Sequence, residues 1–232
     1  MRLAIMQPYF LPYLGYFQLI AAVDLFVVYD NIKYTKQGWI NRNRMLRNGR
    51  DATFTLPLKS ASDSLDVVER ALAPDFHPDH LLNRFRGAYQ RAPNFNRTFP
   101  LLERILRHED TNLFRFLHHS IVSICEHLGI ATEIMVSSHL SIDHRLKNQD
   151  KVLACCEVIG ASTYVNAIGG VALYSKEAFR ARGIDLQFLQ AKPHEYPQFG
   201  DPFVPWLSII DVIMFNDPQA IADMLNTGYT LD

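Results

Sequence analysis

The sequence has little cysteine and no long apolar segment. Its three cysteines, Cys125, Cys155 and Cys156, are an odd number and two are adjacent, so we expect reduced, partly buried thiols rather than a disulfide framework. No apolar run is long enough to cross a bilayer, and the N-terminus lacks a basic region followed by an apolar h-region. These absences predict a cytoplasmic protein that does not associate with membranes.

The chain also lacks an excess of charge of either sign. Twenty-three Lys and Arg residues oppose 24 Asp and Glu residues, for a formal net charge of -1. The bulk positive charge that usually accompanies nucleic-acid binding is therefore absent, although a local basic strip remains open. A hydrophobic content of 48% over 232 residues excludes disorder and allows a substantial core. We expect a single α/β domain over residues 1–232.

Apolar runs alternate with helical patterns along most of the chain. Residues 2–7 read as a buried strand ending at Pro8, a helix follows over 12–23, and residues 25–29 form a second apolar run closed by Asp30. This alternation predicts a mostly parallel, doubly wound (Rossmann-like) sheet. Further strands are expected at 133–137, 163–166 and 184–189, and further helices at 147–159, 175–182, 206–215 and 218–225.

Two segments interrupt the alternation. Asn48-Gly49 lies between two strand-like runs and predicts a β-hairpin over residues 38–58. Residues 76–130 have helical periodicity and predict a helical insertion, with Pro93 and Pro100 separating its helices. Gly169-Gly170 predicts a flexible turn.

Ligands of doubly wound sheets bind at the carboxyl ends of the strands, which here selects residues 7–15, 30–44 and 166–174. In the first segment a strand leads into a helix start, Gly15 permits close approach of backbone, and free amides favour an anion. The other interpretation is a Pro- and Tyr-rich turn that only packs against its neighbours, and the residues do not decide between the two.

The first β-α unit resembles that of the nucleotidylyltransferase superfamily, in which a His-x-Gly-His motif at the helix start holds triphosphate. Here Tyr13-Leu14-Gly15-Tyr16 occupies that place, so both histidines are tyrosines. A phenol can hydrogen-bond a phosphate but stays neutral at pH 7. The resemblance implies nucleotidyl or adenylyl transfer as an alternative function.

The segment after the second strand is dense in groups that recognise ligands. Trp39 can stack on a sugar or base, Arg42 can fork onto phosphate or carboxylate, and Asn43 can read hydroxyls. A solvated hairpin is the alternative, and we favour binding. At the end of a later strand, Asn166, Gly169 and Gly170 precede Tyr174 and could form an anion nest.

Candidate proton-transfer groups also lie after predicted strands. Asp30 follows the second strand, and His144 follows the strand at 133–137, although a surface position is the simpler interpretation of any histidine here. His77 and His80 lack further ligands at zinc spacing, so no metal site is expected. Ser208 and Asp211 are expected to cap or line a helix start.

Four stretches together resemble the WbqC-like family: Met6 to Tyr16, Gly38 to Asn43, Leu56 to Lys59, and Ser208 to Asp211. Members of that family are associated with gene sets for bacterial O-antigen and other surface polysaccharides. The resemblance implies a role in making or decorating an activated sugar.

Our leading hypothesis is an enzyme that transfers an acyl or aminoacyl group to the amine of a nucleotide-linked amino sugar. An aminoacyl donor leaves a charged tRNA open as a partner, and no cofactor is identified. The third interpretation is a non-catalytic protein that binds sugar nucleotides. In the leading hypothesis Asp30 or His144 takes the proton, and the substrate-binding residues are Gln7, Tyr13, Gly15, Tyr16, Trp39, Arg42, Asn43, Lys59, Asn166, Gly169, Gly170 and Tyr174.

Overall fold

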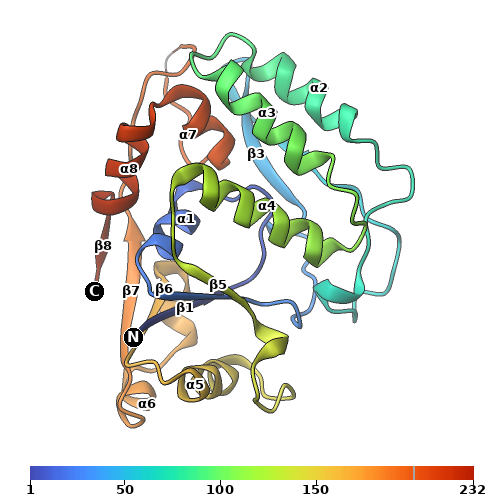
Figure 1. Cartoon of the computed structure of the whole chain (residues 1–232). Coiled ribbons are helices and arrows are strands. Elements are labelled where there is room, and N and C mark those ends of the chain that lie inside the picture. Colours follow the sequence, from blue (N-terminus) through green and yellow to red (C-terminus); the bar gives the residue numbers. More distant parts are fainter. Residues whose placement is uncertain (201) are drawn as a thin grey trace.

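A six-stranded sheet lies at the centre of the molecule (Figure 1). The computed structural model describes residues 1–200 and 202–232. The strand order is β5-β2-β1-β6-β7-β8, and every neighbouring pair is parallel except β7 and β8. The mostly parallel α/β sheet expected from the sequence is therefore confirmed. Its strands are β1 (Arg2–Met6), β2 (Leu25–Val28), β5 (Glu133–Val136), β6 (Thr163–Ala167), β7 (Asp185–Ala191) and β8 (Tyr229–Leu231).

Helices cover both faces of this sheet because successive strand residues point in opposite directions. In β1, Ala4 packs into one apolar core, whereas Leu3 and Ile5 pack into the other. The helices of the larger core are α1 (Leu14–Ala21), α2 (Pro78–Tyr89), α3 (Phe95–Leu106), α4 (Leu113–Leu128), α7 (Ile209–Phe215) and α8 (Pro218–Thr227). In Figure 1, α5 (Asn148–Ile159) and α6 (Lys176–Arg180) lie on the opposite side.

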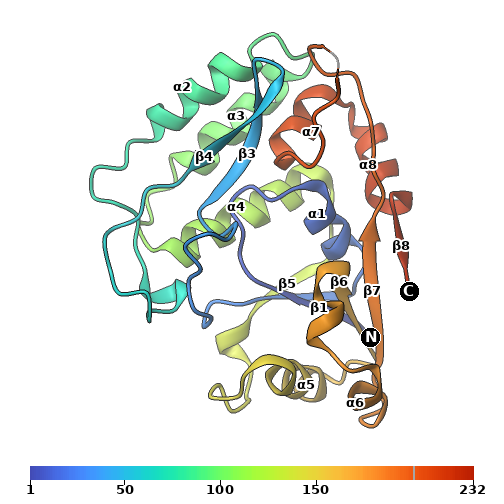
Figure 2. The ribbon, with the colours of Figure 1, turned by 180° about the vertical axis from the view of Figure 1, so that it is seen from behind.

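The expected hairpin forms a separate two-stranded sheet of β3 (Arg42–Arg47) and β4 (Arg50–Thr55), which Figure 2 shows beside α2. Asn48 and Gly49 form the two-residue turn with φ of 53° and 71°. These are residue types that adopt positive φ most readily, so the turn matches the twist of the strands. Met45 and Phe54 bury their side chains in the larger core and anchor the hairpin there.

Three details differ from the sequence-based predictions. Pro100 lies inside α3 rather than at its end, because losing one backbone hydrogen bond costs less than exposing the apolar side chains around it, Phe99 and Leu102 among them. Gly169-Gly170 belongs to a 3-10 helix, η3 (Ile168–Leu173), rather than to an open turn. Strand β8 was not predicted, because three residues carry too short a pattern.

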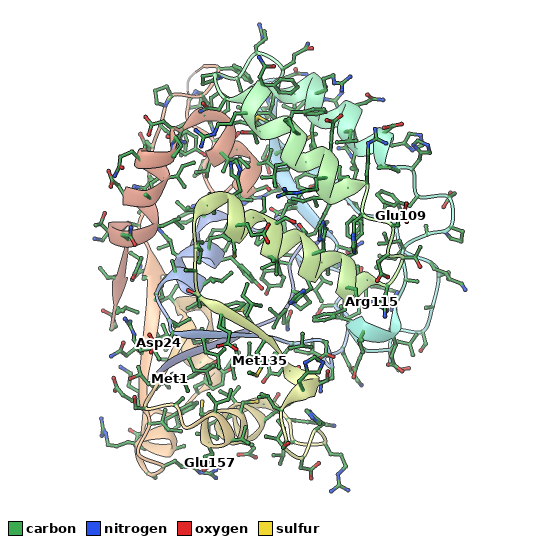
Figure 3. All side chains as sticks on the ribbon, in the orientation of Figure 1. Met1, Asp24, Glu109, Arg115, Met135 and Glu157 are labelled. Atoms are coloured by element: carbon green, nitrogen blue, oxygen red, sulfur yellow. The ribbon has the colours of Figure 1, made fainter. Side chains whose placement is uncertain are left out.

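The amino ends of the parallel strands form one edge of the sheet, here called the amino edge, and their carboxyl ends form the opposite, carboxyl edge. Met1 and Asp24 lie at the amino edge, where the Arg2 amide donates to Asp24 Oδ2 at 2.7 Å (Figure 3). The opposite, carboxyl edge carries the loops after β1, β2, β5 and β6.

No helix of residues 1–200 and 202–232 is long and apolar enough to cross a membrane. Cys155 and Cys156 are buried in mid-helix, and burial raises the pKa of each thiol, to about 11 and about 12.

Candidate functional site

The carboxyl edge brings the ends of β1, β2 and β5 together. Met6 pairs with Val28, and the Tyr29 amide donates to the Met6 carbonyl at 2.9 Å, so Gln7 lies beside the residues that follow β2. Val28 in turn pairs with Val136, which places Ser137 next to Asp30. Segments more than 100 residues apart in sequence thus form one edge.

A continuous hydrogen-bonded cluster, here called the Asp30 network, joins Asp30, Asn31, Ser137, His144 and Lys151. The Ser137 hydroxyl lies 2.7 Å from Asp30 Oδ1 and 2.8 Å from Asn31 Oδ1. Asn31 Nδ2 lies 2.9 Å from His144 Nδ1, and Lys151 Nζ donates to Asn31 Oδ1 at 2.9 Å. The two predicted proton-transfer residues are therefore connected through Asn31 and Ser137 rather than in direct contact.

The hydrogen-bond partners define the state of His144. Its Nε2 lies 3.0 Å from the Leu140 carbonyl oxygen, which can only accept, so Nε2 carries a proton. Asn31 Oδ1 accepts from Lys151, which leaves the Asn31 amide nitrogen to donate to His144 Nδ1. In this arrangement the His144 Nε2 donates to Leu140, and its Nδ1 accepts a hydrogen bond from Asn31 at the exposed end of the network.

The charges of the network are set by burial and by hydrogen bonds. Burial opposes ionisation of Asp30, but hydrogen bonds from Ser138 and Ser137 outweigh it and hold its pKa below the ordinary value. Burial lowers the pKa of Lys151, whose ammonium also lies 5.1 Å from the centre of the Tyr29 ring. A carboxylate and an ammonium thus share one small, mostly buried site.

The segment between β1 and α1, residues 7–13 and here called the first loop, presents the start of α1 at the same edge. No side chain caps this helix, and the ring of Tyr13 lies directly over Gly15, where an added Cβ would meet Tyr13 Cε2 at 2.4 Å. Tyr16 is only 2% exposed, and its hydroxyl donates to the Gln7 carbonyl at 2.9 Å. This burial does not fit the predicted direct contact of Tyr16 with substrate. Tyr16 instead stabilises the loop through its hydrogen bond to Gln7.

Side chains from the hairpin and the C-terminal region hold the first loop in shape. Asn43, expected to orient substrate, is buried and donates to the carbonyls of Phe10 and Leu11 at 3.1 and 3.0 Å. The Ser208 hydroxyl donates to the same Leu11 carbonyl at 2.7 Å and caps α7, as predicted. Asn43 therefore stabilises the loop, because its amide nitrogen is hydrogen-bonded to the protein's own backbone. Leu11 itself has a φ of 45°, an uncommon conformation for a branched side chain.

Both tryptophans of the chain lie exposed around Arg44. Trp39 is 40% exposed and Trp206 is 47% exposed. The Arg44 guanidinium lies 5.6 Å from the Trp39 ring centre and donates to the Trp206 carbonyl at 3.1 Å. Trp206 has a φ of 59°, and its ring lies 6.2 Å from that of Tyr13. Tyr13, Trp39 and Trp206, here together called the aromatic surface, are linked through Arg44 and the Tyr13–Trp206 ring contact, and such side chains can stack against a sugar or base.

The other residues predicted to bind substrate lie in different surroundings from one another. Arg42 donates to the carbonyls of Gly38 and Gln37 and lies 5.8 Å from the Trp39 ring centre. Lys59 is exposed, and its side chain makes no hydrogen bond to the described part of the chain. At the end of β6 the buried Asn166 side chain packs against Gly170, while Tyr174 packs on Tyr164. Gly169 is exposed on η3.

Sequence reasoning missed Asn31, Ser137, Lys151 and Trp206. Ser137 directly follows a predicted strand, and that position alone was a usable signal. Lys151 lies within α5, where nothing in the sequence separates it from a solvated lysine.

Other parts of the molecule offer less chemistry. A hollow of about 300 Å³ lies at the amino end of β7, lined by Ser162, Lys176 and Arg180 among others. It is on the edge opposite the Asp30 network. Within residues 1–200 and 202–232, no group of three His, Cys, Asp or Glu residues is arranged to hold a metal ion. His77 instead caps α2, where its Nδ1 accepts from the Asp79 amide.

Comparisons with known proteins identify the family. No solved structure matches the chain. An uncharacterised protein of Mycobacterium tuberculosis is 28% identical over 230 residues, covering 97% of both chains. Residues 7–223 match the WbqC-like protein family, a span that includes the first loop, the hairpin and α7. The chain therefore belongs to the WbqC-like protein family.

Proposed function

We propose that the protein is a transferase of bacterial surface-polysaccharide (O-antigen) biosynthesis that moves an acyl or aminoacyl group onto the amine of a nucleotide-linked amino sugar. The observation that carries the proposal is the Asp30 network, in which His144 offers an accepting Nδ1 at an exposed position. It lies at the edge of the sheet where doubly wound proteins bind ligands. The aromatic surface at the same edge supports a sugar or base as part of the ligand.

In this mechanism the sugar amine attacks the carbonyl carbon of an activated ester or thioester. A C–N bond forms, the bond from carbonyl carbon to leaving group breaks, and the amine proton goes to His144 Nδ1. The Asn31 amide donates to Nδ1 in the free protein, so the substrate amine takes its place. The proton then passes to the departing alcohol or thiol, which completes the transfer.

The neighbours of His144 stabilise the imidazolium that this step creates. The Leu140 carbonyl accepts from Nε2 and fixes the orientation of the ring. Asp30 stays ionised because of its hydrogen bonds to Ser137 and Ser138, and it supplies negative charge through the network. Lys151 holds Asn31 by bonds to both its side-chain and backbone oxygens, at 2.9 and 3.1 Å.

Nucleotidyl transfer is less well supported. In the resembling superfamily the His-x-Gly-His motif holds triphosphate, but Tyr16 at the place of the second histidine is buried and its hydroxyl donates to the Gln7 carbonyl. Tyr13 contributes no positive charge, because a phenol is neutral when protonated, and burial raises its pKa and keeps it in that neutral form.

The test is amide formation, followed by mass spectrometry, with nucleotide-linked amino sugars and either acyl thioesters or aminoacyl-tRNA as donors. His144→Ala should lower kcat by about 10²- to 10⁴-fold, the usual contribution of a general base. His139→Ala is the matched control, since His139 is an exposed neighbour that makes no hydrogen bond to the described residues. Equal rates in the two variants would remove His144 from the mechanism, and release of pyrophosphate from a nucleoside triphosphate would favour nucleotidyl transfer.

A further inference from the structure

Arg70 is a buried cation without a counter-charge. Arg70 is only 5% exposed and lies in the segment between the hairpin and α2. The ion pairs among residues 1–200 and 202–232 do not include it. Its Nη1 donates to the Ser62 carbonyl at 3.0 Å, but its Nε is buried without a partner. Burying a charge with unfilled hydrogen bonds is costly, so the native structure has to offset it.

The guanidinium of Arg70 contacts an aromatic ring and a backbone carbonyl, neither of which carries a full negative charge. Its guanidinium carbon lies 4.2 Å from the centre of the Tyr34 ring, a cation–π contact that leaves donors free at the guanidinium edge. The Tyr34 hydroxyl is directed away, donating to Asn41 Oδ1 at 2.8 Å. Tyr34 therefore supports the guanidinium from one side only.

A second cation adds to the positive charge. Burial raises the pKa of the Tyr34 hydroxyl, and the positive charges of Arg70, Arg42 and Lys36 oppose that rise. Lys36 is paired with Asp63 at 2.9 Å, so these two charges largely cancel. Arg42 is bonded only to backbone carbonyls and keeps its charge uncompensated. Arg42 directly follows Asn41, whose Oδ1 accepts from the Tyr34 hydroxyl at 2.8 Å, so a second guanidinium outside the ion pairs of the described residues belongs to the segment that contacts Tyr34.

This cluster adjoins the carboxyl edge of the sheet. The Val68 amide, two residues before Arg70, donates to the Asp30 carbonyl at 3.1 Å, and the Val67 amide donates to the Ile32 carbonyl at 2.9 Å. The segment that carries Arg70 thus runs directly along the chain between Asp30 and Tyr34. The cluster and the Asp30 network are neighbours on one surface.

We propose that Arg70, with Tyr34 and Arg42, forms a phosphate-binding subsite. Phosphate fits because it offers several acceptor oxygens and up to two negative charges, which match two guanidinium groups with free donors. Only the identity of the ligand, a nucleotide-linked sugar, rests on the proposed function. Phosphate binding itself can be measured without any transfer reaction, so the two ideas can fail separately.

The experiment is calorimetric titration and thermal unfolding of the full chain with two probes, inorganic phosphate and a nucleoside diphosphate, each up to about 10 mM. Wild type should bind and be stabilised by at least one probe. Arg70→Met should weaken that binding by about tenfold to a hundredfold, as expected for loss of hydrogen bonds to a charged group. Binding of the diphosphate alone identifies a nucleotide as the source, and binding of inorganic phosphate alone identifies the free ion.

Ligand-free stability separates binding from a structural role. Because Arg70→Met removes a buried, unpaired charge, its melting temperature without phosphate should equal or exceed that of wild type. Arg70→Lys keeps the positive charge but loses the planar set of guanidinium N–H donors, so it should bind with intermediate affinity. It also provides the binding test if the methionine variant does not fold. Arg115→Met is the matched control, since Arg115 lies nearby at the start of α4 but is exposed and paired with Asp110 (Figure 3). No binding by wild type, or equal binding by wild type and both Arg70 variants, overturns the proposal.

Discussion

At the scale of single residues, Asp211 shows how a buried carboxyl is stabilised without a cation. It is fully buried and accepts hydrogen bonds from Tyr89 at 3.0 Å and from Tyr196 and Gln198 at 2.7 Å each. These bonds join α2, the segment before α7, and α7 itself. Burial raises the pKa of Asp211, although the three hydrogen bonds oppose the shift.

Asp211→Asn should lower the free energy of unfolding by about 1–3 kcal/mol, because an amide nitrogen then faces a donor in a buried site. The cost should depend on pH. Since the pKa of Asp211 is higher in the folded state, the folded protein retains a proton that the unfolded chain loses above about 3.8. The stability that Asp211 gives the wild-type protein therefore falls as the pH rises from about 3.8 toward the higher pKa of the folded state. The side chain of the asparagine variant does not titrate.

Urea unfolding of both proteins across this pH range measures the difference, with Asp223→Asn, an exposed carboxyl, as control. The cost of Asp211→Asn should be largest in acid and should shrink as pH rises. A cost that grows with pH would show that the hydrogen bonds, not burial, dominate this carboxyl.

At the scale of elements, the start of α1 depends on the contact between Tyr13 and Gly15. Gly15→Ala should force the Tyr13 ring aside, because the added Cβ would lie 2.4 Å from it. The contact between Tyr13 and Trp206 would then be lost, and tryptophan emission should change. Stability should change little, since alanine favours a helix by roughly 0.5–1 kcal/mol and offsets part of the strain.

Gly87→Ala provides the comparison, because Gly87 lies in α2 and an added Cβ there meets nothing within 4 Å. It should raise stability slightly and leave the emission unchanged. Identical emission in Gly15→Ala and wild type would contradict the placement of Tyr13 over the helix start.

Elements with a strong local pattern were predictable from the sequence. The apolar runs of β1 and β2, the Asn48-Gly49 turn and the periodicity of α4 each follow from residue order alone. Pro100 misled the prediction because a single proline is tolerated inside a helix whose apolar face is deeply packed. Strand β8 forms because its backbone pairs with that of β7. A sequence of three residues does not reveal such a partner.

The general position of the candidate groups follows from a rule, but their connections do not. The rule for parallel sheets predicts ligands at the ends of β1, β2 and β6, whereas the Asp30 network joins the ends of β2 and β5. That rule does not say which side chains turn inward: Asn43 and Tyr16 are buried and structural, while Lys151 reaches the site from within α5. These orientations arise from tertiary packing.

At the scale of the whole molecule, the sheet changes direction of winding at β1. The chain places β2 on one side of β1 and later returns to place β6 on the other, so the loops after these strands diverge at one point of the carboxyl edge. The Asp30 network, the first loop and the aromatic surface all border this edge. The family match over residues 7–223 includes every one of these segments.

The central claim is that this edge binds the ligand, and hydrogen exchange measured by mass spectrometry tests it most directly. Nucleotide-linked amino sugars should slow amide exchange in residues 7–16, 29–44 and 137–151, while the amino edge around Ser162 and Arg180 should be unaffected. Protection confined to the hollow at the amino edge, or no protection anywhere with any such sugar, would contradict the account.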